Sequence, residues 1–374
     1  MKVEVNSSAF ADATEWASRI ISARPTVPLL AGIKIRAQEG LLQLSTFNYE
    51  QSARYQIDTG VDEKGVIVVQ GRLLADIARA LPTDKTCLVT EGPRLAIRSG
   101  TSVFNLQLMN ETDYPELPTV PQPIGSIDGK VFADAVGQAV VAVARDENRP
   151  VLTGVRVVFD GDRIVFSATD RFRLTRVTAG WTPAQPDIRT SVIISGTVLK
   201  DIAGSIDTAQ NVVIGYDETE ANLLSFDNAG RVKTSQLIDG EFPNVDRLFA
   251  DEYPIHAVIE KQSLVDALHR VSLVAEREAP IRMEFTGDEV RLSAGAADES
   301  QASEVVAAAL DGEPITVAFN PMYLLSGLGA ISGKYVRMKM TTAIKAVEFN
   351  GQQDKDDEPS LAYRYLLVPM RFIG

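Results

Sequence analysis

The sequence holds very few of the residues from which most catalytic and metal sites are built. Its 374 residues include one cysteine and two histidines. Cys87 has no partner for a disulfide within the chain, which fits a reducing compartment. His256 and His269 have no cysteine, histidine or carboxylate at the spacing of a metal-ligand motif. We therefore expect no catalytic residue, no metal site and no cofactor.

Long hydrophobic runs and an excess of positive charge are also missing. No apolar run reaches the roughly 18 residues that a membrane span needs, so we expect no membrane partner. The N-terminal segment "MKVEVNSSAF" alternates polar and apolar residues, which predicts a strand rather than a signal peptide. Together with the single cysteine, the lack of an export signal leads us to expect a cytoplasmic protein. The 50 acidic residues outnumber the 37 basic ones, for a net charge of -13. This balance argues against binding nucleic acid by overall attraction, but it leaves room for a local basic lining.

What the sequence does contain is a threefold internal repeat. Residues 7–23, 130–145 and 261–276 each place apolar side chains on one face at helical spacing. Their starts lie roughly 125–130 residues apart, a period typical of repeated structural units. Agreement in order, element type and period makes a chance origin a poor explanation.

Each of these helical patterns is followed by the same further elements. Two alternating runs separated by a turn predict a β-hairpin in every copy. An apolar strand and a second helix then recur, in "GVIVVQGRLLADIARALP", "SVIISGTVLKDIAGSI" and "ITVAFNPMYLLSGLGAI". The sequence therefore predicts an α+β fold with antiparallel sheets and three repeated domains, at residues 1–122, 123–252 and 253–374.

Several separate segments, in order along the whole chain, resemble the bacterial sliding clamps, the beta subunits of replicative DNA polymerase III. They are "RPTVPLLAGIKI" (24–35), "RPVLTGVRVVF" (149–159), "SATDRFRL" (167–174), "QLIDGEFPNVDRL" (236–248), "FNPMYLL" (319–325) and "YLLVPMR" (365–371). The resemblance implies a head-to-tail homodimeric ring around double-stranded DNA, with helices lining the hole and sheets outside. Six similar domains from two chains fit such a closed ring.

The resemblance also implies a surface pocket for short peptide motifs of the polymerase III alpha subunit, the clamp loader and repair polymerases. Its aliphatic members suit apolar anchors, Met370 suits varied ligands, and Arg173 and Arg371 suit polar groups at the rim. An alternative for "RFRL" is a strand end with arginines in water and Phe172 in the core. The implied wall is Leu152, Thr169, Arg171, Phe172, Arg173, Leu174, Pro243, Leu248, Asn320, Tyr323, Ile344, Ala346, Leu366, Val368, Pro369, Met370 and Arg371.

The same resemblance suggests two further sets of residues. A modest positive lining would centre an enclosed duplex, and its candidates are Arg24, Arg72, Arg79, Arg149 and Lys200. The candidates for the dimer interface are Phe104, Leu273 and Val274, near possible edge strands at residues 98–108 and 303–310. Solvated surface charge and ordinary core, respectively, remain the alternatives for these two sets.

Two other functions stay open at this point. The chain lacks the basic pair that many clamps carry before the second helix of the second domain, which leaves room for a specialised paralogue such as an antibiotic-insensitive duplicate clamp. An enzyme built on carboxylates is the other possibility, with Asp170 beside Asp201 or Asp239. The main expectation remains a non-enzymatic processivity factor in the cytoplasm, associated with the nucleoid.

Overall fold

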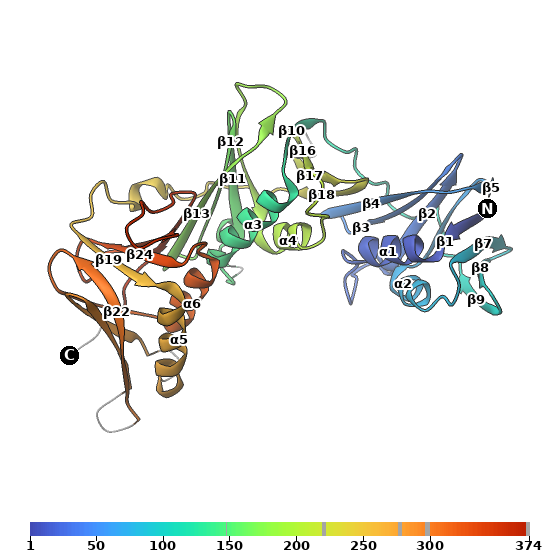
Figure 1. Cartoon of the computed structure of the whole chain (residues 1–374). Helices are drawn as coiled ribbons and strands as arrows, with labels where there is room; N and C mark the ends of the chain where they lie inside the picture. The colour runs from blue at the N-terminus through green and yellow to red at the C-terminus, as the bar shows by residue number, and fades with distance from the viewer. Residues whose placement is uncertain (147, 219–221, 276–278, 296–299, 372–374) are drawn as a thin grey trace. The chain divides into compact units, whose positions relative to one another are not determined.

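The computed structural model describes residues 1–146, 148–218, 222–275, 279–295 and 300–371. It forms two compact units (Figure 1). Unit 1 comprises Met1–Lys130, Thr182–Gln185 and Gly204–Leu237, and unit 2 comprises Val131–Trp181, Pro186–Ala203 and Ile238–Gly374. The predicted α+β class is confirmed, since short helices accompany antiparallel strands throughout the described residues.

The threefold repeat is visible in the order of elements. Each copy has a strand, a helix, three strands, a further strand, a second helix and a closing set of three strands. The first copy is β1 (Lys2–Asn6), α1 (Ser7–Ser18), β2 (Gly32–Gln38), β3 (Leu41–Phe47), β4 (Gln51–Asp58), β6 (Gly65–Gln70), α2 (Gly71–Arg79), β7 (Lys85–Glu91), β8 (Arg94–Ser99) and β9 (Ser102–Gln107), with β5 (Val61–Glu63) as an addition.

The second and third copies follow the same order. The second is β10 (Pro123–Ile127), α3 (Gly129–Ala139), β11 (Gly154–Asp160), β12 (Arg163–Thr169), β13 (Arg173–Gly180), β15 (Arg189–Ser195), α4 (Gly196–Ala203), β16 (Val212–Asp217), β17 (Leu223–Asn228) and β18 (Arg231–Gln236), with β14 (Thr182–Pro183) added. The third is β19 (Ile255–Glu260), α5 (Lys261–Val271), β20 (Ile281–Thr286), β21 (Glu289–Ala294), β22 (Ala302–Asp311), β23 (Ile315–Phe319), α6 (Pro321–Ala330), β24 (Tyr335–Met340), β25 (Val347–Gln352) and β26 (Tyr363–Leu367).

The first helix of each copy is shorter than its apolar pattern predicts. The α3 and α5 helices continue as 3₁₀ turns at Val140–Ala142 and Ser272–Val274. A tighter 3₁₀ turn keeps similar residues facing the core, so the apolar spacing does not mark where the α-helix ends. The loop that follows the 3₁₀ turn of the second copy includes residue 147, which lies outside the described residues.

Local sequence explains how these helices begin and what they bury. The Asn6 side chain accepts a hydrogen bond from the Ala9 N–H at 2.9 Å and caps α1. Phe10, Ala13 and Ala17 of that helix are completely buried in the core of unit 1. The α1 and α2 helices contact each other, and α1 packs on β3 and β4 (Figure 1). The first copy in unit 1 is thus built of two helices packed on its sheets.

Successive copies are joined through their sheets. In unit 1 a nine-stranded sheet has the order β14-β10-β16-β17-β18-β4-β3-β2-β6, and a five-stranded sheet has the order β5-β1-β7-β8-β9. In unit 2 one sheet runs β15-β11-β12-β13-β26-β25-β24-β19-β22-β21-β20-β23. The junctions are β4 with β18 and β13 with β26, both antiparallel. These shared sheets explain why the two compact units do not coincide with the three predicted domains, whose boundaries stay a prediction.

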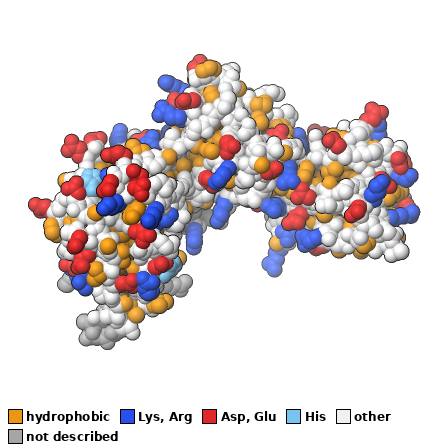
Figure 2. Space-filling view, viewed as in Figure 1, with side chains coloured by type: hydrophobic (Ala, Val, Ile, Leu, Met, Phe, Trp, Pro, Cys, Tyr) orange, Lys and Arg blue, Asp and Glu red, His pale blue; other side chains and the backbone are white. Residues whose placement is uncertain are grey.

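The surface has the mixed charge expected of an acidic globular chain. Figure 2 shows acidic and basic side chains interspersed over the face in view. No helix in the described part of the chain combines the length and the apolar character needed to cross a membrane.

Candidate functional site

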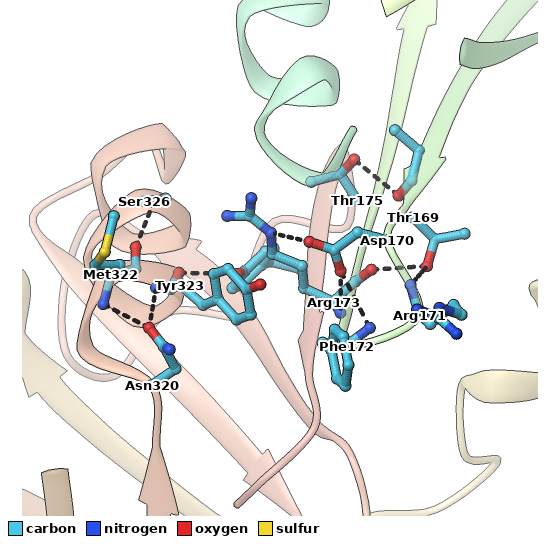
Figure 3. A network of polar contacts seen from close by, with 12 residues as sticks. Thr169, Asp170, Arg171, Phe172, Arg173, Thr175, Asn320, Met322, Tyr323 and Ser326 are labelled. Atoms are coloured by element: carbon cyan, nitrogen blue, oxygen red, sulfur yellow. Dashed lines mark hydrogen bonds and ion pairs between the residues drawn. The ribbon is translucent and has the colours of Figure 1, made fainter. Parts of the chain in front are cut away.

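The site is organised by the turn that connects β12 to β13, and Figure 3 shows its hydrogen bonds. The Asp170 Oδ1 atom accepts hydrogen bonds from the Phe172 and Arg173 N–H groups at 3.1 and 3.0 Å. The Thr169 Oγ1 atom accepts from the Arg171 N–H at 3.1 Å and donates to the Arg173 carbonyl at 2.7 Å. This network fixes Arg171 at φ 81°, in the left-handed region that favours glycine.

The two residues after Arg171 contradict the alternative in which the arginines of "RFRL" face water and Phe172 lies in the core. Arg173 is buried, with a side chain 9% exposed, and its Nε atom donates to Asp170 Oδ2 at 2.9 Å. Its guanidinium also lies 4.3 Å from the centre of the Tyr323 ring. Phe172, by contrast, is 52% exposed. The arginine thus completes a buried ion pair, while the phenylalanine is left at the surface.

A pocket of about 390 Å³ opens beside this turn in unit 2. The Phe172 and Tyr323 rings stack in its wall with centroids 6.4 Å apart. The α6 helix supplies the opposite side, and Asn320 caps it by accepting hydrogen bonds from the Met322 and Tyr323 N–H groups. The full lining is Val143, Ala144, Arg145, Asp146, Arg149, Leu152, Asp170, Arg171, Phe172, Arg173, Asn320, Met322, Tyr323 and Ser326.

Part of the implied peptide site lies in this lining. The implied residues that line the pocket are Leu152, Arg171, Phe172, Arg173, Asn320 and Tyr323. The sequence prediction missed six lining residues: Val143, Ala144, Arg145, Asp146, Met322 and Ser326. Met322 and Ser326 are exposed and lie four residues apart on α6, on either side of Tyr323 in the sequence. Arg149, expected to face DNA, also lines this pocket.

Other implied wall residues form the support beneath. Leu174 and Leu366 are buried together with Ile193, Phe242 and Val245, and Ala346 packs against this cluster. Thr169 and Pro369 are buried as well. These residues contribute to packing rather than to the lining of the 390 Å³ pocket.

A third group of implied residues carries exposed apolar surface. Leu248, Ile344 and Val368 are 56%, 69% and 42% exposed. Each lies one or two residues from Leu366, a member of the buried cluster, or from Phe249 or Ala346, which pack against that cluster. Val368 also donates its N–H to the Phe172 carbonyl at 2.9 Å. Of the remaining implied residues, Pro243 and Arg371 are exposed and Met370 is half-buried.

The basic candidates for a DNA-facing surface differ in their environment. Arg24, Arg72 and Lys200 are exposed, and Arg72 donates to the Ile21 carbonyl at 2.7 Å. Arg79 lies 3.6 Å from Asp76 and 3.8 Å from Glu15, so part of its charge is already balanced. Arg24, Arg72 and Lys200 therefore carry most of the available positive charge in this set.

The candidates for the dimer interface differ in their surroundings. Phe104 belongs to β9, which ends its sheet, and it packs partly on the core of unit 1. Leu273 is 84% exposed, so it is not an ordinary core residue. Val274 is half-buried beside it.

Asp170 and Tyr365, the ionisable groups beside Arg173 and Tyr323, are engaged in structural hydrogen bonds. The described residues contain no cluster of three or more histidine, cysteine or carboxylate side chains able to hold a metal ion. Both carboxylate oxygens of Asp170 are occupied by the turn and by Arg173, which gives that residue a structural role. Burial raises the pKa of the nearby Tyr365 phenol, which donates to the Tyr323 carbonyl at 2.8 Å.

The chain holds three copies of one α+β repeat that are joined through their sheets, with a pocket on the second and third copies. This is the architecture implied for a DNA sliding clamp. Models of the DNA polymerase III beta subunit match its N-terminal domain at residues 1–118, its central domain at 126–244 and its C-terminal domain at 246–365. The chain belongs to the DNA polymerase III beta subunit family. It is a sliding clamp, the processivity factor that encircles duplex DNA and tethers the replicative polymerase.

Known relatives agree over the whole length. The chain is 40% identical over 376 residues to the beta sliding clamp of Streptomyces coelicolor, with all of both chains covered. It is 35% identical over 372 residues to the beta sliding clamp homolog GriR of Streptomyces muensis, again with full coverage. Its fold matches the sliding clamp of Pseudomonas aeruginosa bound to griselimycin, with a TM-score of 0.92, 22% identity and full coverage of both.

Proposed function

We propose that this clamp is a head-to-tail homodimer without catalytic activity of its own, and that the pocket beside Phe172 binds short peptide motifs of its partners. The partners are the polymerase III alpha subunit, the clamp loader and repair polymerases. The setting is the cytoplasm, in association with the nucleoid. The single observation that carries the peptide site is a stacked aromatic pair, the exposed Phe172 and the half-buried Tyr323, in a pocket of about 390 Å³.

The way in which the copies join within the chain supports the proposed dimer. Within the chain, the last strand of the three-strand set that follows the first helix pairs with the final strand of the next copy, as β4 with β18 and β13 with β26. The equivalent strands left over are β22 of the third copy and β9 of the first. The β9 strand is an edge, and residues 302–307 of β22 pair on one side with β21. Pairing β22 of one chain with β9 of another would repeat the junction and close a ring.

The pocket suits a peptide with apolar anchors. Leu152, Phe172 and Tyr323 offer aliphatic and aromatic contact area, and Met322 is an adaptable, exposed neighbour. Leu248, Ile344 and Val368 extend the exposed apolar surface of unit 2. Contiguous exposed apolar surface marks binding sites, and these three residues are therefore candidates for contacts with the part of a peptide that lies outside the pocket.

Enclosure accounts for DNA retention by a chain of net charge -13. Tight phosphate contacts would hold the protein in one place and weaken steeply with salt. A closed ring stays on DNA while it moves, since escape requires opening of the ring. Arg24, Arg72 and Lys200 then need only centre the duplex.

A second candidate function keeps the same fold. The likeness to the GriR homolog, at 35% identity, is consistent with a specialised paralogue that duplicates a housekeeping clamp, although the identity to an ordinary beta sliding clamp is higher, at 40%. Deleting the gene distinguishes the two: loss of viability supports the housekeeping role, and survival with increased sensitivity to a clamp-directed antibiotic supports the paralogue.

The peptide site is tested by fluorescence anisotropy with a labelled peptide that carries adjacent Leu and Phe anchors. We expect Phe172→Ser to weaken binding about tenfold, because it removes an aromatic contact in the pocket wall. Leu361→Ser is the matched control, since Leu361 is also exposed (58%) but does not line the pocket. Equal affinity of the wild-type protein and the Phe172 variant would contradict the assignment.

A further inference from the structure

Arg171 is the residue of the site whose backbone conformation calls for an explanation. It stands at φ 81°, where glycine fits without strain and a residue with a Cβ does not. Only three other non-glycine residues among those described have positive φ, namely Tyr49, Asn222 and Ala229. A strained residue at a binding pocket points to a use for its side chain.

The turn leaves Arg171 little freedom to relax. Its N–H donates to Thr169 Oγ1, and the next two N–H groups donate to Asp170 Oδ1. The side chain itself is exposed, with its guanidinium 5.7 Å from the centre of the Phe172 ring. The charge is therefore held at the rim of the pocket, directly beside the exposed aromatic ring (Figure 3).

The charge of Arg171 is also unmatched. Among the ion pairs of the described part of the chain, Asp170 is paired with Arg173, and Arg171 takes part in none. Asp146, the other acidic residue of the lining, accepts two hydrogen bonds from Asn148. The lining thus holds four arginines and two aspartates, an excess of positive charge in a chain of net charge -13.

Resting on the proposed function of this pocket, we propose that Arg171 is a specificity-determining residue that selects peptides with an acidic side chain next to their apolar anchor. A carboxylate of the peptide pairs with the Arg171 guanidinium while the anchor packs on Phe172. Arg145 and Arg149 also line the pocket. Glu147, which stands between them in the sequence, lies outside the described residues. We therefore assign the selection to Arg171 alone.

The test uses three labelled peptides with the same Leu-Phe anchor, flanked by Asp and Glu, by Asn and Gln, or by Lys. Their affinities for the full-length protein are measured by fluorescence anisotropy at low and high salt. We expect the acidic peptide to bind roughly two- to fivefold more tightly than the neutral one, as for an exposed ion pair. The Lys peptide should be the weakest, and all differences should shrink in 0.5 M salt.

Three variants at Arg171 separate charge from structure. Arg171→Gly suits the backbone conformation and should abolish the preference, Arg171→Lys should retain it, and Arg171→Glu should invert it. Arg163→Ala is the matched control, because Arg163 is an exposed arginine (64%) at the other end of β12. Thermal melting monitored by circular dichroism confirms that each variant is folded.

The outcomes distinguish this inference from the proposed function. Binding of all three peptides with equal affinity, or an acidic preference that persists in Arg171→Gly, would overturn the role of Arg171 and leave the peptide site standing. Failure of the folded wild-type protein to bind any of the three would overturn the peptide site, and the selection with it.

Discussion

At the scale of single residues, the two arginines of the turn have different environments and therefore different roles. Arg173 and Asp170 form a buried pair that shapes the turn, whereas their neighbours Arg171 and Phe172 face outward. The sequence motif alone did not reveal this division, since a run of Arg-Phe-Arg carries no information on which arginine is buried. The left-handed turn decides it, because Asp170 and Thr169 capture the backbone N–H groups.

A second buried charge lies on β25. The Glu348 side chain is fully buried, and both of its oxygens accept hydrogen bonds from Arg364 at 2.7 Å. Arg364 in turn lies 3.8 Å from the centre of the Phe249 ring, next to the exposed Leu248. Burial opposes ionisation of Glu348, but the hydrogen bonds from Arg364 and Tyr253 outweigh it and lower the pKa of the carboxyl below 4.5.

This pair predicts a pH dependence of stability. Because the folded state lowers the pKa of Glu348, its carboxylate contributes stability above pH 4.5, and this contribution is lost as the pH falls further. We expect Glu348→Gln to lower the free energy of unfolding by about 1.5–3 kcal/mol at pH 7. Urea denaturation from pH 3 to 7 should show the difference from wild type shrinking below pH 4.5. A difference that does not change with pH would contradict the role of the charge.

At the scale of elements, the sequence predicted what depends on local periodicity. The hairpins, the second helices after "GVIVVQ", "SVIISG" and "ITVAFN", and the order of elements are all present. The ends of α3 and α5 were predicted too late, because the 3₁₀ turn that follows each keeps the same apolar face. The placement of Arg149 in the pocket lining could not be predicted, since it depends on how the loop before β11 packs against α6.

The α6 helix, which carries Tyr323, is held close to β26 by a glycine. A Cβ on Gly327 would clash with the ring of Tyr365, which is fully buried and cannot move aside easily. We expect Gly327→Ala to lower the free energy of unfolding by about 1–3 kcal/mol through overpacking. It should also weaken peptide binding, because it displaces Tyr323.

The matched control lies two residues further along the same helix. A Cβ on Gly329 would meet no atom within 4 Å. Gly329→Ala should therefore raise the free energy of unfolding, by up to about 1 kcal/mol, and leave the pocket unchanged. Chemical denaturation and peptide anisotropy measure both effects. Equal behaviour of the two variants would show that the contact with Tyr365 does not position α6.

At the scale of the whole molecule, one type of strand pairing joins the copies within the chain and, in the proposed dimer, would also join the two chains. Within the chain, β4 pairs with β18 and β13 pairs with β26. The proposed dimer adds the equivalent pairing of β22 with β9 of a second chain. Such repetition is visible in the sequence as a period of roughly 125 residues. The junctions themselves were not predicted, because strand pairing between copies leaves no local pattern.

The dimer predicts the effect of a charge at its proposed edge. Leu273 follows α5 and is 84% exposed in the single chain. We expect Leu273→Glu to weaken dimerisation at least tenfold in sedimentation experiments, since it buries a carboxylate in the interface. Leu361→Glu changes another exposed leucine and should leave the dimer intact. A full-strength dimer in the Leu273 variant would remove that residue from the interface.

The central claim is that this clamp holds DNA by surrounding it, and retention on circular and linear DNA tests it most directly. The protein is loaded on a nicked circular plasmid by a clamp loader, separated from free protein by gel filtration, and followed after the circle is cut. The account predicts stable retention on the circle and rapid release once the DNA is linear, with little dependence on salt. Release at the same rate from both forms would contradict it.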